Sequence, residues 1–117
     1  DSFYDATSNE TATISVTGVS GGSASESGTQ AVTITITDNE SAPTVTLSTA
    51  STSIDENSTD TITLTATLTN ATYQDVTVSI DGTGGTGTEG TDFGTVSDIT
   101  ISAGSATGTV TFDPTDD

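Results

Sequence analysis

The stretch Thr61-Ile62-Thr63-Leu64-Thr65-Ala66-Thr67-Leu68-Thr69 alternates threonine with an apolar residue at every step. Successive side chains of a β-strand point to opposite faces, so this order gathers the apolar residues on one face and the threonines on the other. Threonine is β-branched and favours extended backbone. The stretch therefore predicts a β-strand with one buried and one solvated face.

The same alternation recurs in six further segments, separated by turn-forming Gly, Asn and Asp residues. These segments are 12–16, 32–36, 45–47, 76–80, 99–101 and 110–112. No segment has a helical period. Together with 61–69, they predict an all-β fold of about seven strands, and seven short antiparallel strands are typical of an immunoglobulin-like Greek-key β-sandwich.

The charge of the chain is entirely negative. Its 117 residues include 17 acidic residues and no lysine, arginine or histidine, for a net charge of −17 at pH 7. Without a cationic side chain the protein has nothing to contact phosphates, so nucleic acid and an anionic membrane surface are excluded as partners. The sequence shows neither an apolar run long enough to span a membrane nor a signal peptide. Clustered carboxylates do attract hard divalent cations, of which Ca²⁺ is the expected one.

Catalysis is not expected from this composition. The chain has no histidine, cysteine or lysine to act as a base or nucleophile, and no arginine to hold an anion. Paired carboxylates can hydrolyse glycosides, but a sugar-binding cleft is usually aromatic, and the chain has no tryptophan and only two tyrosines. The Gly-rich stretch 82–90 lacks the Gly-Lys-Ser/Thr sequence of a phosphate-binding loop. We therefore expect that the protein is not an enzyme.

The acidic hexapeptide Asp38-Asn39-Glu40-Ser41-Ala42-Pro43 is typical of a junction between modules rather than of a hairpin turn. It divides the chain into a segment 1–40 with two predicted strands and a segment 41–117 with five. We predict that these segments belong to different β-sandwich repeats.

Short motifs in both segments occur in the order of a known family. In the second segment, the strand Thr44-Val45-Thr46-Leu47 is followed by Ser53-Ile54-Asp55-Glu56-Asn57, then by Gly90-Thr91-Asp92-Phe93, and the last strand leads to Asp116-Asp117. Residues 41–117 thereby resemble the opening half of a Calx-β domain, the calcium-binding module of sodium–calcium exchangers and of many giant bacterial adhesins. Residues 1–40, with Tyr4-Asp5, Glu10-Thr11-Ala12 and Ile36-Thr37-Asp38-Asn39-Glu40, are similar to the closing half.

The resemblance implies a set of Ca²⁺ ligands at one end of each sandwich. In the opening half-domain they are Glu56, Asp92, Asp116 and Asp117, and in the closing half-domain Asp5 and Asp38. The alternative is that such residues stand in turns for their hydrogen bonds alone, which is the preferred interpretation of Asp75 and Asp98.

The closing half-domain precedes the opening one, so the chain resembles one period of a tandem array cut in mid-domain. Closure of both halves into one permuted sandwich would require residues 41–43 to cross a strand length of roughly 20 Å. Three residues reach only about 10 Å when fully extended. We therefore expect a neighbouring copy to complete each sandwich, either along one giant chain or between subunits of a filament.

All four asparagines, at positions 9, 39, 57 and 70, open Asn-x-Ser/Thr sequons, which are acceptors for N-glycosylation in secreted proteins. Asn70, in a predicted loop, and Asn9 are the candidates, because Asn39 and Asn57 lie beside proposed Ca²⁺ ligands. A Thr-rich chain also forms sequons by chance.

These observations predict a mechanical function. The chain is expected to be an extracellular or cell-surface repeat module of a prokaryotic adhesin or filament, bound head to tail to copies of itself and rigidified by Ca²⁺ at the junctions. Two alternatives remain open. One is a filament subunit that exchanges strands with its neighbours, and the other is a β-sandwich that binds a cell-surface protein or a glycan through its loops.

Overall fold

The computed structural model describes residues 3–4 and 9–116, and within these residues it contains β-strands and no helix. The strands are β1 (Asn9–Ser15), β2 (Ala31–Thr37), β3 (Val45–Thr49), β4 (Ile62–Leu68), β5 (Val76–Val78), β6 (Ile99–Ile101) and β7 (Thr107–Phe112). Each pairing between them is antiparallel. The predicted all-β fold with seven strands is confirmed.

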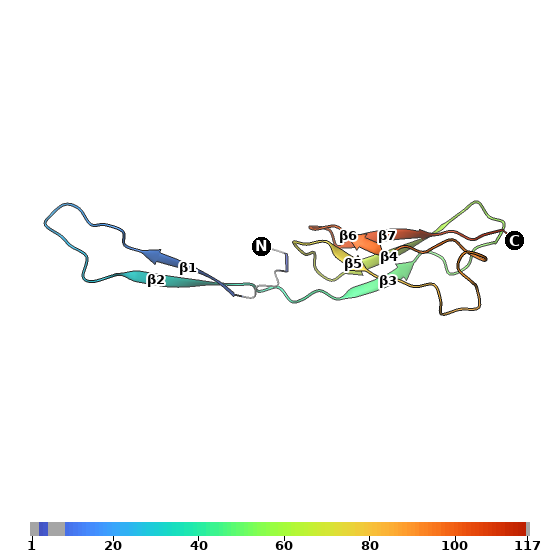
Figure 1. Ribbon diagram of the computed structural model, residues 1–117, viewed down its shortest axis with the longest axis horizontal. Coiled ribbons are helices and arrows are strands. Elements are labelled where there is room, and N and C mark those ends of the chain that lie inside the picture. Colours follow the sequence, from blue (N-terminus) through green and yellow to red (C-terminus); the bar gives the residue numbers. More distant parts are fainter. Residues whose placement is uncertain (1–2, 5–8, 117) are drawn as a thin grey trace. The chain divides into compact units, whose positions relative to one another are not determined.

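The chain divides into two compact units, each of which is described by itself (Figure 1). The smaller unit, Asp5–Asn39, holds β1 and β2, and the larger unit holds β3 to β7. The division falls after residue 39, and Phe3 and Tyr4 belong with the larger unit.

The smaller unit is a β-hairpin with two chemically different faces. The register opposes Ala12 to Ile34 and Ile14 to Val32 on one face, and Thr13 to Thr33 on the other. The hydroxyl groups of Thr13 and Thr33 lie 3.0 Å apart in a hydrogen bond. Directly opposite residues of an antiparallel pair share a face, so the hairpin is amphipathic.

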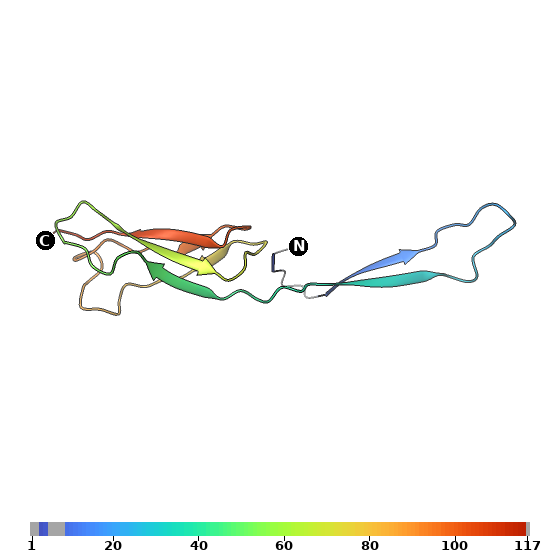
Figure 2. The same ribbon diagram turned by 180° about the vertical axis from the view of Figure 1, so that it is seen from behind.

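The larger unit contains a three-stranded sheet in the order β3-β4-β7. In Figure 2, β4 lies between β3 and β7. The register opposes Val45 to Leu68 and Leu47 to Ala66 across β3 and β4, and Leu64 to Val110 across β4 and β7. One face of all three strands is therefore apolar.

A second sheet, β5-β6, covers part of this apolar face. Ala66 and Leu68 of β4 form the buried core together with Ile99 and Ile101 of β6. Val76, Val78 and Ile80 pack against that core from β5 and the residues after it. Gly108 of β7 permits the close approach of β6, because a Cβ atom at this position would lie 2.5 Å from the carbonyl oxygen of Thr100. The larger unit is thus a two-layered β structure.

Candidate functional site

Three of the predicted Ca²⁺ ligands lie at one end of the larger unit. Ile62, the first residue of β4, pairs with Phe112, the last residue of β7. Glu56, which precedes β4, and Asp116, which follows β7, therefore flank the same end of the sheet. Asp92 is tied to this end because its carbonyl oxygen accepts a hydrogen bond from the backbone N–H of Thr115 at 3.0 Å.

The Gly-x-Asp-Phe motif forms a closed turn. The carboxylate of Asp92 accepts a hydrogen bond from the backbone N–H of Thr88 at 2.5 Å, and the backbone N–H of Asp92 donates to the Thr88 carbonyl at 2.9 Å. Gly90 has a φ of 83°, a left-handed conformation that glycine adopts without steric cost. Asp92 therefore has a structural role in its turn, whether or not it also binds an ion.

An aromatic contact fixes this turn to the sheet. Phe93 is 7% exposed, and its ring centroid lies 5.1 Å from that of Phe112. A Cβ atom at Gly82 would lie 2.8 Å from the ring of Phe93, so only glycine fits there in this arrangement. Gly94 donates its backbone N–H to the carbonyl oxygen of Asp113 at 3.0 Å, which joins the turn to the chain after β7.

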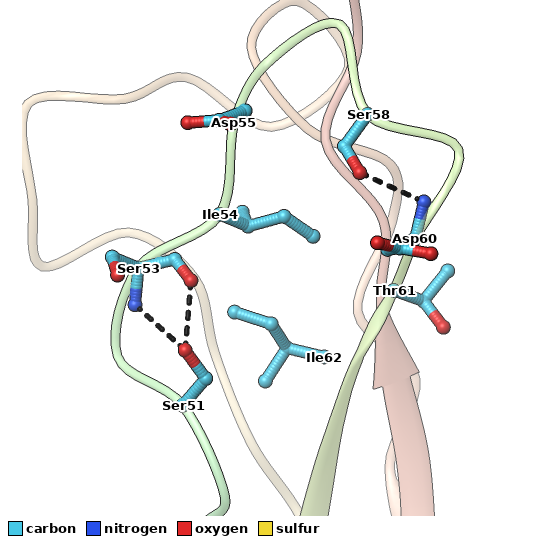
Figure 3. Close-up of a pocket in the computed structure, with 8 residues that line it drawn as sticks. All are labelled: Ser51, Ser53, Ile54, Asp55, Ser58, Asp60, Thr61 and Ile62. Atoms are coloured by element: carbon cyan, nitrogen blue, oxygen red, sulfur yellow. Dashed lines mark hydrogen bonds between the residues drawn. The ribbon is translucent and has the colours of Figure 1, made fainter.

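The loop that connects β3 to β4, which carries Glu56, encloses a depression of about 390 Å³ (Figure 3). The side chains of Ile54 and Ile62 point into it, and short hydrogen bonds within the loop hold its rim, among them one from the backbone N–H of Asp60 to the Ser58 hydroxyl at 3.0 Å. None of the eight lining residues is aromatic: they are Ser51, Ser53, Ile54, Asp55, Ser58, Asp60, Thr61 and Ile62. This lining lacks the aromatic platform on which a sugar ring usually stacks.

The predicted ligands do not all fall within the described residues. Glu56, Asp92 and Asp116 are exposed, and Asp38 is half-buried in the smaller unit. Asp5 and Asp117 lie outside the residues that the structure describes. Within residues 3–4 and 9–116, no three His, Cys, Asp or Glu side chains come close enough to hold a metal ion.

Asp75 and Asp98 have the hydrogen-bonding roles preferred for them from the sequence. Asp75 accepts the backbone N–H of Ala103 at 2.8 Å. Asp98 accepts the hydroxyl of Ser79 at 3.1 Å and the backbone N–H of Ile80 at 3.3 Å. Both carboxylates join the β5 segment to the β6 segment.

The two glycosylation candidates differ in accessibility. Asn9 is exposed at the start of β1, whereas Asn70, in the bend that directly follows β4, is half-buried. The Asn70 side-chain amide donates a hydrogen bond to the carbonyl oxygen of Ser41 at 3.2 Å. A glycan on Asn70 would share this nitrogen with the contact to Ser41.

Sequence reasoning did not identify the most unusual surface of the protein, which is apolar rather than acidic. Ile14, Val32, Ile34 and Ile36 of the hairpin are 60%, 66%, 52% and 55% exposed, and Val45 and Leu47 of β3 are 46% and 55% exposed. Only five hydrophobic residues of the described chain are buried. Alternation shows that the apolar residues of one strand share a face of that strand, but it does not indicate what covers the face.

The described residues include no helix with the length and hydropathy needed to cross a bilayer. Comparisons of the chain with protein-family models, with curated proteins and with solved structures found no match.

Proposed function

We propose that this chain is a structural module of an extracellular fibre or cell-surface adhesin, and that its copies associate head to tail. The observation that carries the proposal is the apolar face of the hairpin, on which four branched aliphatic side chains are more than half exposed. Apolar patches of this kind on otherwise polar proteins usually mark an interaction surface. Two faces of this type on one chain, on the hairpin and on β3, favour association between copies.

The proposed fold is an immunoglobulin-like Greek-key β-sandwich of the Calx-β type. In this assignment β3, β4, β5, β6 and β7 are the first five strands of one sandwich, and β1 and β2 are the last two strands of another. The antiparallel pairings and the two packed layers of the larger unit support the assignment, as do the sequence motifs that resemble the family.

The composition supports a mechanical rather than a chemical function. The chain has no histidine, cysteine, lysine or arginine, so it lacks histidine, the most frequent general base, and the Cys and Lys nucleophiles. The four sequons are compatible with an extracellular location.

Sedimentation velocity tests the proposal directly. At pH 7 in about 0.15 M NaCl, where the Debye length is about 8 Å, we expect the mean mass to rise with protein concentration beyond that of a dimer. Negative-stain electron microscopy of the same samples should show rods of constant width. A chain that stays monomeric over the whole accessible concentration range would overturn the proposal.

We further propose that Ca²⁺ binds where modules meet. Three exposed carboxylates at one end of the larger unit, Glu56, Asp92 and Asp116, support this, together with a net charge of −17 that no cationic side chain offsets. The remaining oxygen ligands would come from residues beyond the described ranges or from the next copy.

A melting curve with excess EDTA and with added CaCl₂ tests the ion, with MgCl₂ at equal ionic strength as the control for screening. We expect Ca²⁺ to raise the melting temperature more than Mg²⁺, and the difference to disappear in E56Q together with D116N. The variant E26Q, which removes one charge from the hairpin loop, should keep it. Equal shifts with both ions would show that screening alone acts.

A further inference from the structure

We propose that the β1–β2 hairpin of one copy is inserted into the larger unit of a second copy, where β1 pairs with the free edge of β5. This inference rests on the proposed function and specifies the contact by which the copies associate. The larger unit of each chain would accept the hairpin of one neighbouring copy, and the hairpin of the same chain would be donated to the next copy.

The acceptor is an apolar face that its own second layer covers only in part. The second layer has two strands, β5 and β6, and the first layer has three, β3, β4 and β7. β6 lies against β7, as the close approach of Gly108 to Ile99 and Ile101 shows. Ala66 and Leu68 on β4 are 0% and 5% exposed. The apolar residues of β3, on the same face, remain about half exposed. The β5-β6 layer therefore lacks one strand that would be needed to cover β3.

The free edge of β5 borders this gap. Val76–Val78 pairs with β6 on one side only, and no other described strand pairs with it. Tyr4 forms a parallel bridge with Thr72, just before β5, and among the described residues no bridge reaches this edge at residues 76–78. An unpaired edge presents a row of backbone N–H and C=O groups that a further strand can satisfy.

The donor supplies the missing strand as β1 and extends the layer by one further strand, β2. The hairpin supplies two strands, and its apolar face carries Ala12, Ile14 and Val16 from the β1 side and Val32, Ile34 and Ile36 from β2, with Glu10 opposite Ile36 at one end. With β1 beside β5 and β2 beyond it, this face would meet the exposed side chains of Val45 and Leu47 on β3. Its threonine face would continue the solvated outer face of β5 and β6.

The alternation selects one register. In an antiparallel pair, placing Ser15 opposite Thr77 also opposes Val16 to Val76 and Ile14 to Val78. All four valine and isoleucine side chains then point to the core, because Val76 and Val78 already pack there. A shift by one residue would turn the threonines inward.

The direction of β5 follows from its two ends. At its start, the carbonyl oxygen of Thr72 accepts the N–H of Gly104 at 2.8 Å, and Ala106 accepts the N–H of Leu68 at 2.8 Å, so β5 begins where β4 ends. After β5, Gly82 touches Phe93, whose ring contacts Phe112 opposite the first residue of β4. β5 therefore runs antiparallel to β4 and parallel to β3. In the proposed pairing, β2 is also parallel to β3.

Chain length explains why the hairpin must come from a second copy. The end of β2 would lie a strand length from the start of β3, which is about 23 Å for seven residues. Residues 41–44 cannot span this distance, because Asn70 holds the Ser41 carbonyl at 3.2 Å and Thr69 and Thr44 exchange hydrogen bonds. Only residues 38–40 remain, and the four Cα–Cα steps from Thr37 to Ser41 reach about 15 Å at most.

The proposed contact joins two different surfaces of the chain, the hairpin of one copy and the larger unit of the next. Such a heterologous contact does not close on itself by two-fold symmetry, and its repetition builds rings or an open filament. The contact therefore provides for the fibre without any additional interface.

Disulfide cross-linking tests the pairing, and the chain has no cysteine of its own to interfere. The substitutions S15C and T77C are at exposed positions. We expect the double variant, oxidised at a concentration where the wild type assembles, to give a ladder of dimers, trimers and higher species on a non-reducing gel. Mixing the two single variants should give a disulfide-linked heterodimer and nothing larger.

The matched control is T35C combined with T77C, which places the donor cysteine on the same polar face but on β2. It should give at least tenfold less cross-linked product. A disulfide within one chain, seen as a monomer of altered mobility, would overturn the proposal in favour of a permuted monomer. Assembly of the wild type without cross-linking of the Ser15–Thr77 pair would overturn this contact and leave the proposed function standing. A monomeric wild type would overturn both.

Discussion

Replacing Gly108 by alanine should destabilise the larger unit, although alanine is generally favoured over glycine in the middle of a strand. Glycine in the middle of a strand costs roughly 0.5–1 kcal/mol relative to alanine. Against this, the new Cβ atom would lie 2.5 Å from the Thr100 carbonyl oxygen, 2.9 Å from Cγ2 of Ile99 and 3.0 Å from Cγ1 of Ile101. Overpacking a well-filled core costs about 1–3 kcal/mol. The expected net loss in the free energy of unfolding is therefore about 1 kcal/mol.

Urea denaturation followed by far-UV circular dichroism measures this loss. With a slope of about 1 kcal/mol per molar urea, as for small domains, the midpoint should fall by about 1 M. All variants are compared at one protein concentration, because association between copies would stabilise the folded state.

G84A is the matched control. No atom lies within 4 Å of a Cβ at Gly84, and its φ is outside the left-handed region. The substitution should therefore be neutral or stabilise the protein by about 0.4–1 kcal/mol through the unfolded chain. If G108A unfolds at the same urea concentration as G84A or at a higher one, β6 does not pack closely against Gly108 of β7.

Three further predictions concern the contact between Gly82 and Phe93, the hydrogen bonds of Asp98, and the net charge. Because a Cβ atom at Gly82 would lie 2.8 Å from the ring of Phe93, G82A should destabilise the wild type by about 1–3 kcal/mol. The loss should be much smaller in the F93A background, and additive effects of the two substitutions on the urea midpoint would refute this contact. Since Asp98 accepts hydrogen bonds from Ser79 and Ile80, D98A should cost about 1–2 kcal/mol of unfolding free energy, and D98N, which keeps one acceptor oxygen, should cost less; equal losses would argue against these bonds. Because all charges have one sign, raising NaCl from about 10 mM to 0.5 M should raise the melting temperature, and a fall would contradict the expected repulsion.

The strands could be predicted from the sequence because each has one apolar and one polar face, so its period is visible locally. The boundaries were predicted less well, for identifiable reasons. Ile80 continues the alternation of β5, but the Asp98 carboxylate accepts its N–H in place of a neighbouring strand. β7 begins at Thr107, three residues before the predicted segment 110–112. The prediction began too late because Gly108 has no apolar side chain to continue the alternation, although it pairs with Ala66.

The candidate site could be predicted only in its local parts. The Gly90–Phe93 motif indicated a turn, and hydrogen bonds between near neighbours form that turn. The contact of Phe93 with Gly82 and Phe112 depends on chain segments that meet only in the folded unit, so no local pattern indicates it. The same holds for Val45 and Leu47, whose exposure depends on how many strands the opposite layer contains.

The exposed apolar faces and the uniform charge act against each other, and their balance should make assembly depend on salt. Fully burying a Val, Leu or Ile side chain contributes about 1.5–3 kcal/mol, so a half-exposed one contributes about 1 kcal/mol. Seven residues have about this exposure on the two apolar faces: Ile14, Val16, Val32, Ile34 and Ile36 of the hairpin and Val45 and Leu47 of β3. They would together contribute about 7 kcal/mol to the contact.

Two copies that each carry a charge of −17 repel one another while this contact forms. At about 10 mM salt the Debye length is about 30 Å, longer than a strand, whereas at about 0.1 M it is about 10 Å. Because the contact buries apolar side chains and forms no ion pair between cationic and anionic side chains, salt should weaken the repulsion and leave the attraction intact. The mean mass in sedimentation velocity should therefore rise with NaCl concentration at constant protein concentration. A mass that falls with salt would show that the copies are held together by charge, for example through bridging cations, and that the apolar faces do not drive assembly.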